Sequence, residues 1–335
     1  MVYFATYGAS ASAVTLNVFK FYLGGVLPQQ GGFMTFSAKL SAAVRAKKTP
    51  VLVGIDPRFK SIPECLKTGV SEYDLKGVAN VYRTFSFRIL DVIAPHVACV
   101  KPQLAFFEAV GPYGMLALAD VIEYARKLGL VVILDGKRND IGSTAEGYAA
   151  AYLGESSAWK GDALTVSPYL GEDSVLPFVN VAQQNDAGIF VLVKTSNPGG
   201  GMLQDLVADG RTIFQHTADW VEKTAAEFAR EKGEKYGAVG AVVGATYPEQ
   251  LAELRKRMPH AWLLVPGFGA QGGTVQDVAH AFDEDGLGAI INNSRGIIFA
   301  HARKDYAGKF ADSDWEKAVE TAVLEMKAQF ADFIR

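Results

Sequence analysis

The stretch of the chain with the most chemically suggestive side chains is VVILDGKRNDIGSTA, residues 131–145, where charged residues follow an apolar run. In an extended strand, residues two apart share a face, so Asp135 and Lys137 point the same way and the glycine between them points the other. Asp140 follows three residues later, and Lys101 ends the preceding apolar run. We expect an array of alternating ammonium and carboxylate groups, in which each buried lysine stays charged because a carboxylate lies beside it.

Such an array supports two interpretations. Charged strand ends can form a purely structural ion-pair network. Catalysis is favoured here because Asp56 ends another predicted strand and a phosphate-type loop occurs later in the chain. A fixed ammonium group can stabilise negative charge that develops on a substrate, and it can also donate a proton.

Two later segments have the composition of an anion-binding site, PGFGAQGGT over residues 266–274 and NSRG over residues 293–296. Glycines let backbone N–H groups approach an anion closely, and an arginine adds a two-pronged guanidinium. A flexible turn is the alternative for the glycine segment alone. No Walker or Rossmann signature follows the first predicted strand, so we expect a ligand with one phosphate. The residues expected in this site include Gly269, Gly272, Ser294 and Arg295.

A third segment, KTSNPGGG over residues 194–201, has the composition of an ordinary turn. Its Thr195 and Ser196 could equally hydrogen-bond a heterocycle, if they face the same rim as the charged array.

The elements that must position these residues alternate along the chain. Helix-like segments with apolar residues three to four apart include residues 74–93, 114–128, 212–232 and 247–258. Between such segments, short apolar and β-branched runs predict eight strands, over residues 51–55, 97–100, 130–134, 163–166, 189–193, 238–243, 262–265 and 289–292. Continuous apolar strands are typical of a parallel sheet buried on both faces. The alternation therefore predicts a single-domain α/β fold, a (β/α)8 TIM barrel, with a doubly wound open sheet as the alternative.

The position of the polar residues favours the barrel. The first six predicted strands are followed by polar groups, and the last two by the glycine-rich and NSRG segments. In a (β/α)8 barrel the carboxyl ends of all strands meet at one rim, which carries the active site. The polar groups at the first six strand ends are Asp56, Lys101, Asp135, Ser167, Lys194 and Thr246.

Composition excludes several classes of protein. Thirty-three basic and 36 acidic residues leave a net charge of −3, without the long basic run that binds a nucleic acid polymer or an anionic membrane. Cys65 and Cys99 form neither a disulfide framework nor a zinc motif, and no apolar stretch approaches the roughly 20 residues of a membrane span. We expect a cytoplasmic protein that binds a small molecule and has no metal site.

The first 33 residues lack the basic leader of a secretory signal. We interpret residues 1–33 as a weakly structured extension or leader, and residues 34–335 as the barrel. The alternative is an additional helix over residues 11–23.

Taken together, the motifs LDGKRNDIGST, PGFGAQGG and NNSRG resemble the orotidine 5′-phosphate decarboxylase family. VGIDPR, VKPQLAFFE, LTVSPYLG and VKTSNPGG resemble its longer, mycobacterial-type (type 2) branch, and the likeness runs in order from about residue 34 to the C-terminus. The resemblance implies a cofactor-free barrel that converts orotidine 5′-monophosphate to uridine 5′-monophosphate and CO2, the last step of de novo pyrimidine synthesis. It implies a catalytic array of Lys101, Asp135, Lys137 and Asp140, in which Lys137 stabilises and protonates a carbanion at C6.

The resemblance also implies the binding residues. It assigns Asp56 to the ribose hydroxyls and Ser196 to the pyrimidine. Gln271 and Arg295 match the phosphate ligands. It further implies a homodimer in which one segment of each subunit completes the neighbouring subunit's site, the segment containing Asp140, Ile141 and Thr144.

Three other functions remain open. A Mg²⁺-dependent sugar-phosphate decarboxylase or aldolase of the same barrel superfamily, such as 3-keto-L-gulonate 6-phosphate decarboxylase, reuses an Asp-x-Lys-x-x-Asp array. A non-catalytic phosphate-binding barrel would bind a nucleotide without turnover. A Schiff-base aldolase using Lys137 or Lys194 is disfavoured, because a lysine flanked by carboxylates stays protonated and is a poor nucleophile.

Overall fold

The structure of the protein is a computed structural model, which describes residues 34–269 and 272–334. Residues 34–335 group into one compact unit. The predicted extension over residues 1–33, with its alternative helix at 11–23, lies outside the described residues.

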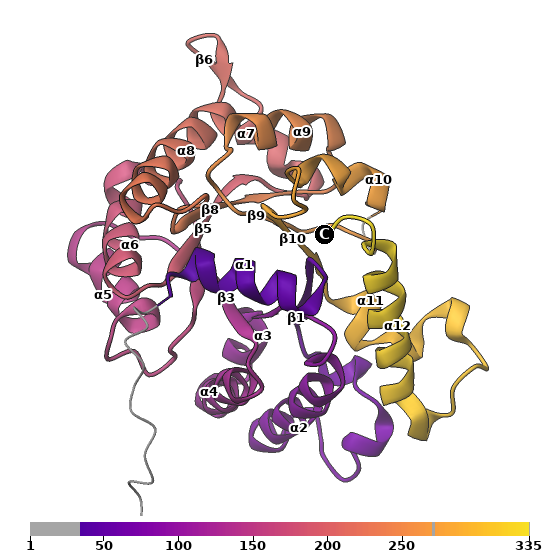
Figure 1. The fold of residues 1–335 in the computed structure, drawn as a ribbon. Helices are drawn as coiled ribbons and strands as arrows, with labels where there is room; N and C mark the ends of the chain where they lie inside the picture. The colour runs from indigo at the N-terminus through magenta and orange to yellow at the C-terminus, as the bar shows by residue number, and fades with distance from the viewer. Residues whose placement is uncertain (1–33, 270–271, 335) are drawn as a thin grey trace, which may run out of the picture. The chain divides into compact units, whose positions relative to one another are not determined.

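Eight parallel strands close into a barrel, and each is followed by helical structure, which confirms the predicted (β/α)8 fold (Figure 1). Around the barrel the strands follow the order β1-β10-β9-β8-β5-β4-β3-β2, so neighbours in sequence are neighbours in space. A small antiparallel hairpin, β6 (Val207–Ala208) with β7 (Arg211–Thr212), is inserted between β5 and β8 and projects outward in Figure 1. The barrel strands are β1 (Val51–Ile55), β2 (Cys99–Pro102), β3 (Val131–Arg138), β4 (Ala163–Val166), β5 (Gly188–Lys194), β8 (Val239–Val243), β9 (Leu263–Val265) and β10 (Ala289–Asn293).

Several strands extend further than their apolar runs predicted. Lys101 pairs in register with Gly54 of β1, so it lies inside β2 instead of after it. Asp135 and Lys137 likewise belong to β3, which continues to Arg138. Backbone pairing in a parallel sheet does not depend on apolar side chains, so the strands continue into the polar residues of the rim.

The helices surround the barrel, and local signals set many of their ends. Thr35 caps α1 by accepting a hydrogen bond from the backbone of Ala38. Thr212 and Gln215 form a capping box at the start of α8, which ends at Gly233 in the left-handed region, with φ of 66°. The α-helices are α1 (Phe36–Lys47), α2 (Leu75–Ile93), α3 (Leu104–Glu108), α4 (Gly111–Lys127), α5 (Gly142–Leu153), α6 (Glu172–Gln184), α7 (Gly201–Gln204), α8 (Ile213–Lys232), α9 (Pro248–Arg257), α10 (Val275–Val278), α11 (Arg295–Ile298) and α12 (Trp315–Gln329).

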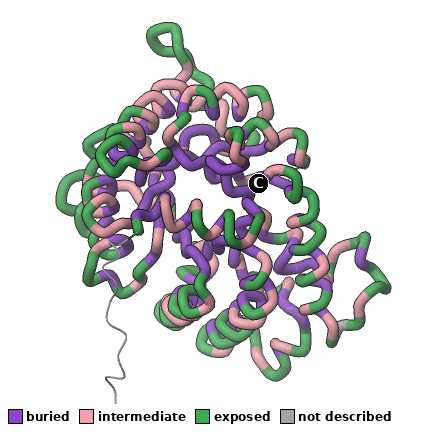
Figure 2. The backbone as a smooth tube through the Cα atoms, in the orientation of Figure 1, coloured by how far each residue is buried: buried purple, intermediate pink, exposed green. Residues whose placement is uncertain are grey.

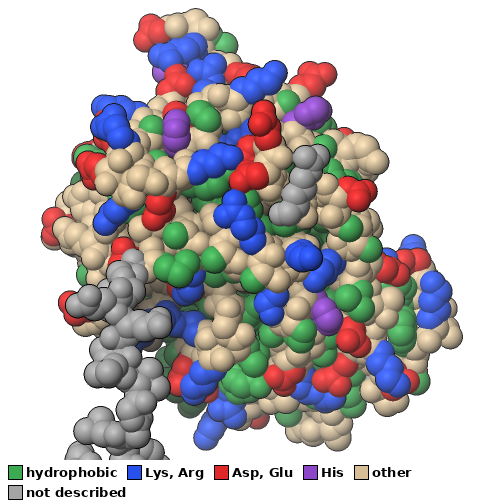
Figure 3. Space-filling view, viewed as in Figure 1, with side chains coloured by type: hydrophobic (Ala, Val, Ile, Leu, Met, Phe, Trp, Pro, Cys, Tyr) green, Lys and Arg blue, Asp and Glu red, His purple; other side chains and the backbone are tan. Residues whose placement is uncertain are grey.

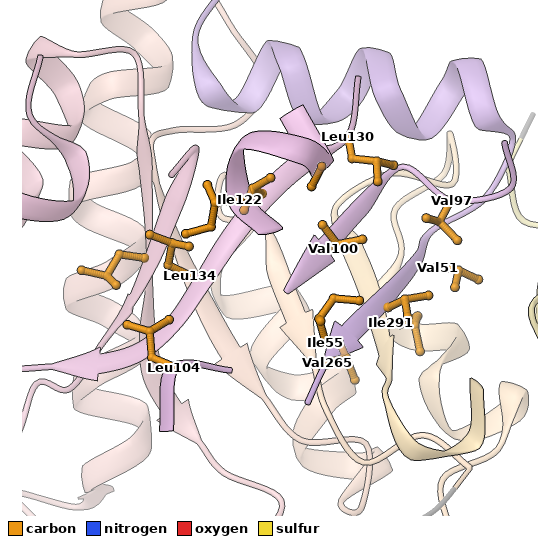
Figure 4. Close-up of a cluster of buried hydrophobic side chains, with 14 of the residues drawn as sticks. Val51, Ile55, Val97, Val100, Leu104, Ile122, Leu130, Leu134, Val265 and Ile291 are labelled. Atoms are coloured by element: carbon orange, nitrogen blue, oxygen red, sulfur yellow. The ribbon is translucent and has the colours of Figure 1, made fainter. Parts of the chain in front are cut away.

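The strands are buried on both faces, as the tube in Figure 2 shows, while exposed residues concentrate on the outer helices. Outward-facing residues such as Val100, Leu134 and Ile291 belong to the main core, together with Ile122 of α4 and Leu104 of α3 (Figure 4). Because each strand packs against apolar side chains on both of its faces, its sequence is continuously apolar.

Inward-facing residues form a second core that α1 covers at the amino-terminal end of the barrel. Phe36 of α1 makes an edge-to-face contact with Phe190 of β5, with ring centroids 5.8 Å apart. Lys39 of α1 forms an ion pair with Asp162, which also accepts a hydrogen bond from the backbone of Val132. With this end filled by apolar side chains, the opposite rim is the open end of the barrel.

Basic and acidic side chains are interspersed over the face seen in Figure 3. Among the described residues, none of the helices has the length and apolar character needed to cross a lipid bilayer.

Candidate active site

The carboxylate of Asp135 is the centre of a hydrogen-bonded array at the carboxyl ends of the strands. Its Oδ2 accepts from Lys101 Nζ at 2.6 Å and from Gln103 Nε2 at 2.9 Å. Its Oδ1 accepts from Lys137 Nζ at 2.5 Å and from Thr165 Oγ1 at 3.0 Å. Four donors from β2, β3, β4 and the residue after β2 thus fix this carboxylate in one orientation.

The backbone of β3 is distorted at Lys137. Its φ of 44° lies in the left-handed region, which costs a residue with a side chain about 1 to 3 kcal/mol. The pairing of β3 with β4 shifts register between Leu134 and Arg138, and the N–H of Lys137 is bound by the hydroxyl of Thr165 at 2.9 Å. The bulge and this hydroxyl hold the strained residue in place, so the direction of the Lys137 ammonium is set by the fold.

Electrostatics keep the array charged. Burial alone would raise the pKa of Asp135, but the charges and hydrogen bonds of Lys101 and Lys137 hold that pKa well below its usual value. Burial opposes the charged form of Lys101 in the same way, yet Asp135 and Asp56 raise the pKa of Lys101 above the ordinary lysine value. Lys101 is deeply buried, whereas the Lys137 side chain is 48% exposed. Both lysines line the cavity described below, and Lys137 is the more accessible of the two.

A cavity of about 330 Å³ opens above the array. This volume lies within the roughly 300–1,000 Å³ typical of small-molecule sites. Its wall combines charged residues in or directly after β1 to β3 with apolar residues in or directly after β5, β8 and β9, namely Leu192, Val242, Leu264 and Pro266. A planar ring can therefore lie against apolar side chains while its edge faces the ammonium of Lys137.

Three oxygen atoms at β1 and β10 are buried at this cavity without a hydrogen-bond partner among the described residues. They are Asp56 Oδ1, Asn292 Oδ1 and Ser294 Oγ, and all three residues line the cavity. Close approach explains the glycine at position 54, because a Cβ there would lie 1.8 Å from Ser294 Oγ. Buried polar atoms are normally paired, so these oxygens are available to the hydroxyl groups of a ligand.

Thr195 and Ser196 also line the cavity, at the start of the segment that follows β5. Gln204 anchors this segment: its side chain accepts from the Thr195 backbone at 3.0 Å and donates to the Thr195 hydroxyl at 2.8 Å. Lys194 is 1% exposed and forms an ion pair with Asp205. Lys194 therefore holds the segment through its ion pair with Asp205. It does not line the cavity, which removes it as a candidate nucleophile for a Schiff-base aldolase.

The glycine-rich segment lies at the cavity's edge, but the amides of Gly269 and Gly272 already donate hydrogen bonds within the segment. Gly269 N donates to the Gly273 carbonyl and Gly272 N donates to the Gly269 carbonyl, both at 2.9 Å. Gly269 and Gly272 have φ of 68° and 95°, which explains the need for glycine at both positions. Gln271 lies outside the described residues.

Arg295 and Ser294 line the cavity as predicted, on the segment that follows β10. Asp140, Ile141 and Thr144 do not reach it. Asp140 Oδ1 accepts a hydrogen bond from Ile141 N at 2.8 Å, and Ile141 is 57% exposed at the start of α5. Within one subunit, the structure thus joins Lys101, Asp135 and Lys137 and leaves Asp140 outside.

Sequence reasoning missed Gln103 and Thr165, both of which bind Asp135. Residues two apart on a strand share a face, so alternation could have identified both. Gln103 lies two residues after Lys101, and Thr165 lies two residues before Ser167. Ser167 and Thr246 were expected at the rim, but neither lines the cavity. The described residues contain no group of three or more His, Cys, Asp or Glu side chains placed to bind a metal ion.

Comparisons with known proteins find one family. The profile of the orotidine 5′-phosphate decarboxylase / HUMPS family matches residues 74–310. An orotidine 5′-phosphate decarboxylase from Rhodopirellula baltica is 54% identical over 300 residues, covering 88% of this chain and 99% of that protein. One from Deinococcus radiodurans is 44% identical, covering 79% of this chain and 90% of its own length. The solved structure of Leishmania donovani OMP decarboxylase has a TM-score of 0.67 at 32% identity, covering 89% of this chain and 99% of that one.

Proposed function

The chain belongs to the orotidine 5′-phosphate decarboxylase family, and from that premise we propose that it converts orotidine 5′-monophosphate to uridine 5′-monophosphate and CO2 by charge stabilisation beside Lys137. The observation that carries this mechanism is the pair of lysines held on one buried carboxylate, with Lys137 open to the cavity. The reaction makes the protein a carboxy-lyase of pyrimidine biosynthesis.

The chemistry requires a fixed positive charge. Loss of CO2 from C6 leaves an electron pair in the plane of the ring, where the π system cannot delocalise it. An ammonium group already oriented toward C6 stabilises that charge without reorganising, and it then donates its proton to the same carbon. The hydrogen bond to Asp135 and the bulge in β3 support Lys137 in this role.

Asp135 positions Lys137, and Lys101 in turn positions Asp135. The carboxylate of Asp135 orients Lys137 by accepting its hydrogen bond, and it would lie near the carboxylate that leaves the substrate. Lys101 and Gln103 hold Asp135 from the opposite side, at its other oxygen. Repulsion between the two carboxylates is relieved as CO2 departs.

The rest of the substrate binds around the rim. Asp56 and Ser294, with their unpartnered oxygens, are suited to ribose hydroxyls. Thr195 and Ser196 are placed to hydrogen-bond the pyrimidine. The phosphate is assigned to the glycine-rich segment and Arg295, with Gly269, Gln271 and Gly272 in that segment. Binding energy gained at this remote group can be used at C6 in the transition state.

The functional unit is proposed to be a homodimer. Asp140 lies outside its own subunit's cavity, and exposed Ile141 and Thr144 extend from the same turn into α5. These residues are assigned to the neighbouring subunit's site, where Asp140 completes the array. The motifs VGIDPR, VKPQLAFFE, LTVSPYLG and VKTSNPGG support the longer, mycobacterial-type branch of the family, and the lack of a disulfide framework supports a cytoplasmic location.

The mechanism uses neither a metal ion nor an organic cofactor. In a Mg²⁺-dependent relative the Asp-x-Lys-x-x-Asp carboxylates would bind the metal, but here both oxygens of Asp135 already accept two hydrogen bonds each. The deciding experiment follows the absorbance of orotidine 5′-monophosphate with purified protein in EDTA. We expect full decarboxylase activity; activity that EDTA abolishes and Mg²⁺ restores would contradict the proposal.

A further inference from the structure

A second, larger cavity of about 1,270 Å³ adjoins the first. Glycine-rich residues, the turn after β1 and the amino-terminal part of α11 form much of its lining. The two cavities share four lining residues, which mark the place where they meet: Arg58, Phe268, Asn293 and Arg295. Two guanidinium groups therefore lie at the junction.

Arg58 follows β1 by three residues, and its guanidinium lies 5.0 Å from the centre of the Phe106 ring. Such stacking orients the charged group without neutralising it. Among the described residues, neither Arg58 nor Arg295 has a carboxylate partner within ion-pair distance.

The other basic side chains of the larger cavity are compensated. Lys60 pairs with Glu72 at 3.4 Å, and Arg303 pairs with Asp305 and Glu325. The uncompensated positive charge is thus concentrated on Arg58 and Arg295, at the end of the small cavity that β1 and β10 form.

A phosphate monoester carries a charge of about −1.5 to −2 at neutral pH and offers three acceptor oxygens. The amides of Gly269 and Gly272 are bound within their own segment, so these two groups do not add to the donors that side chains offer to a phosphate. One arginine satisfies at most two of the three oxygens in a fork geometry.

We infer that Arg58 is a second phosphate-binding residue, which holds the substrate phosphate against Arg295 at the junction of the two cavities. This inference rests on the proposed function and extends it to a residue outside the glycine-rich and NSRG segments. Phe106 acts as a positioning residue, because its ring supports the Arg58 guanidinium.

The test compares ligands with and without phosphate. Binding of uridine 5′-monophosphate and of uridine is measured by calorimetry for the wild type, Arg58→Gln and Arg58→Lys. Lys60→Gln is the matched control, since it removes a neighbouring charge that is already paired. We expect Arg58→Gln to weaken uridine 5′-monophosphate binding by about 10- to 100-fold, with uridine binding unchanged and Arg58→Lys intermediate.

Steady-state kinetics gives the second readout. Arg58→Gln should lower kcat/KM for orotidine 5′-monophosphate while leaving kcat/KM for orotidine unchanged. Equal losses with both substrates, or no loss with either, would overturn the assignment of Arg58 alone. Wild-type protein that neither binds uridine 5′-monophosphate nor decarboxylates its substrate would overturn the proposed function itself.

Discussion

Lys137 Nζ lies 2.5 Å from Asp135 Oδ1 on the same strand, and it does so from a backbone with φ of 44°. Regular alternation puts both side chains on the inner face of the barrel, and the bulge in β3 adds a turn that aims the lysine across the carboxylate. The strain is retained because Thr165 binds both the Lys137 N–H and the Asp135 carboxylate. The array is therefore a rigid unit built from three adjacent strands.

Replacing Lys101 should destabilise the fold. Lys101→Met leaves the buried Asp135 without one of its two cationic partners, and breaking a buried pair costs about 3 to 5 kcal/mol in the free energy of unfolding. The control is Lys127→Met, which breaks an exposed i,i+4 pair with Glu123 and should leave the free energy of unfolding nearly unchanged. Urea unfolding of both variants measures the difference. Equal stabilities for the two variants would show that the buried pair is not required.

Asp135 should contribute stability that depends on pH in a specific direction. Its pKa is below the ordinary value of 3.8, so its charged form favours the folded state above about pH 4. That contribution is lost as the pH falls through the lowered pKa. The difference in unfolding free energy between the wild type and Asp135→Asn should be constant from pH 7 to 5 and shrink below about pH 4. A difference that already closes between pH 7 and 5 would contradict a lowered pKa.

Hybrid dimers test the assignment of Asp140 to the neighbouring site. Lys137→Ala and Asp140→Ala subunits are each expected to be inactive as homodimers. When they are mixed and allowed to exchange, a hybrid contains one site with an intact Lys137 and an intact partner Asp140. Random exchange should restore roughly a quarter of wild-type turnover, because about half the dimers are hybrids with one working site each. A mixture as inactive as its parents would place Asp140 in its own subunit's site.

The sequence was sufficient to predict the elements and the central array. Eight apolar runs gave the eight barrel strands, and alternation brought Asp135 and Lys137 together, because both properties are local. Gln103 was missed because the apolar run ended before Lys101, while the strand itself continues to Pro102. The left-handed backbone at Lys137 depends on the shifted pairing of β3 with β4, which no local pattern encodes.

Other features depend on tertiary context in the same way. The glycine-rich segment predicted free amides, but those of Gly269 and Gly272 are bound within the turn that they form. Arg58 ends the VGIDPR motif, but the motif gave it no role, since the role inferred for it comes from lining both cavities together with Arg295. The role proposed for Asp140 needs a second subunit, which one chain's sequence does not position.

The most direct test of the mechanism is the decarboxylation rate of Lys137→Ala, measured by absorbance beside calorimetric binding of uridine 5′-monophosphate. Lys127→Ala, at an exposed helical position, is the control and should retain wild-type activity. We predict that Lys137→Ala loses turnover on the order of 10⁴-fold or more, because it removes both the fixed charge and the proton donor, while the product still binds. Turnover within about tenfold of wild type would contradict the account, because Lys101, the other ammonium group on Asp135, is almost fully buried and hydrogen-bonded to that carboxylate.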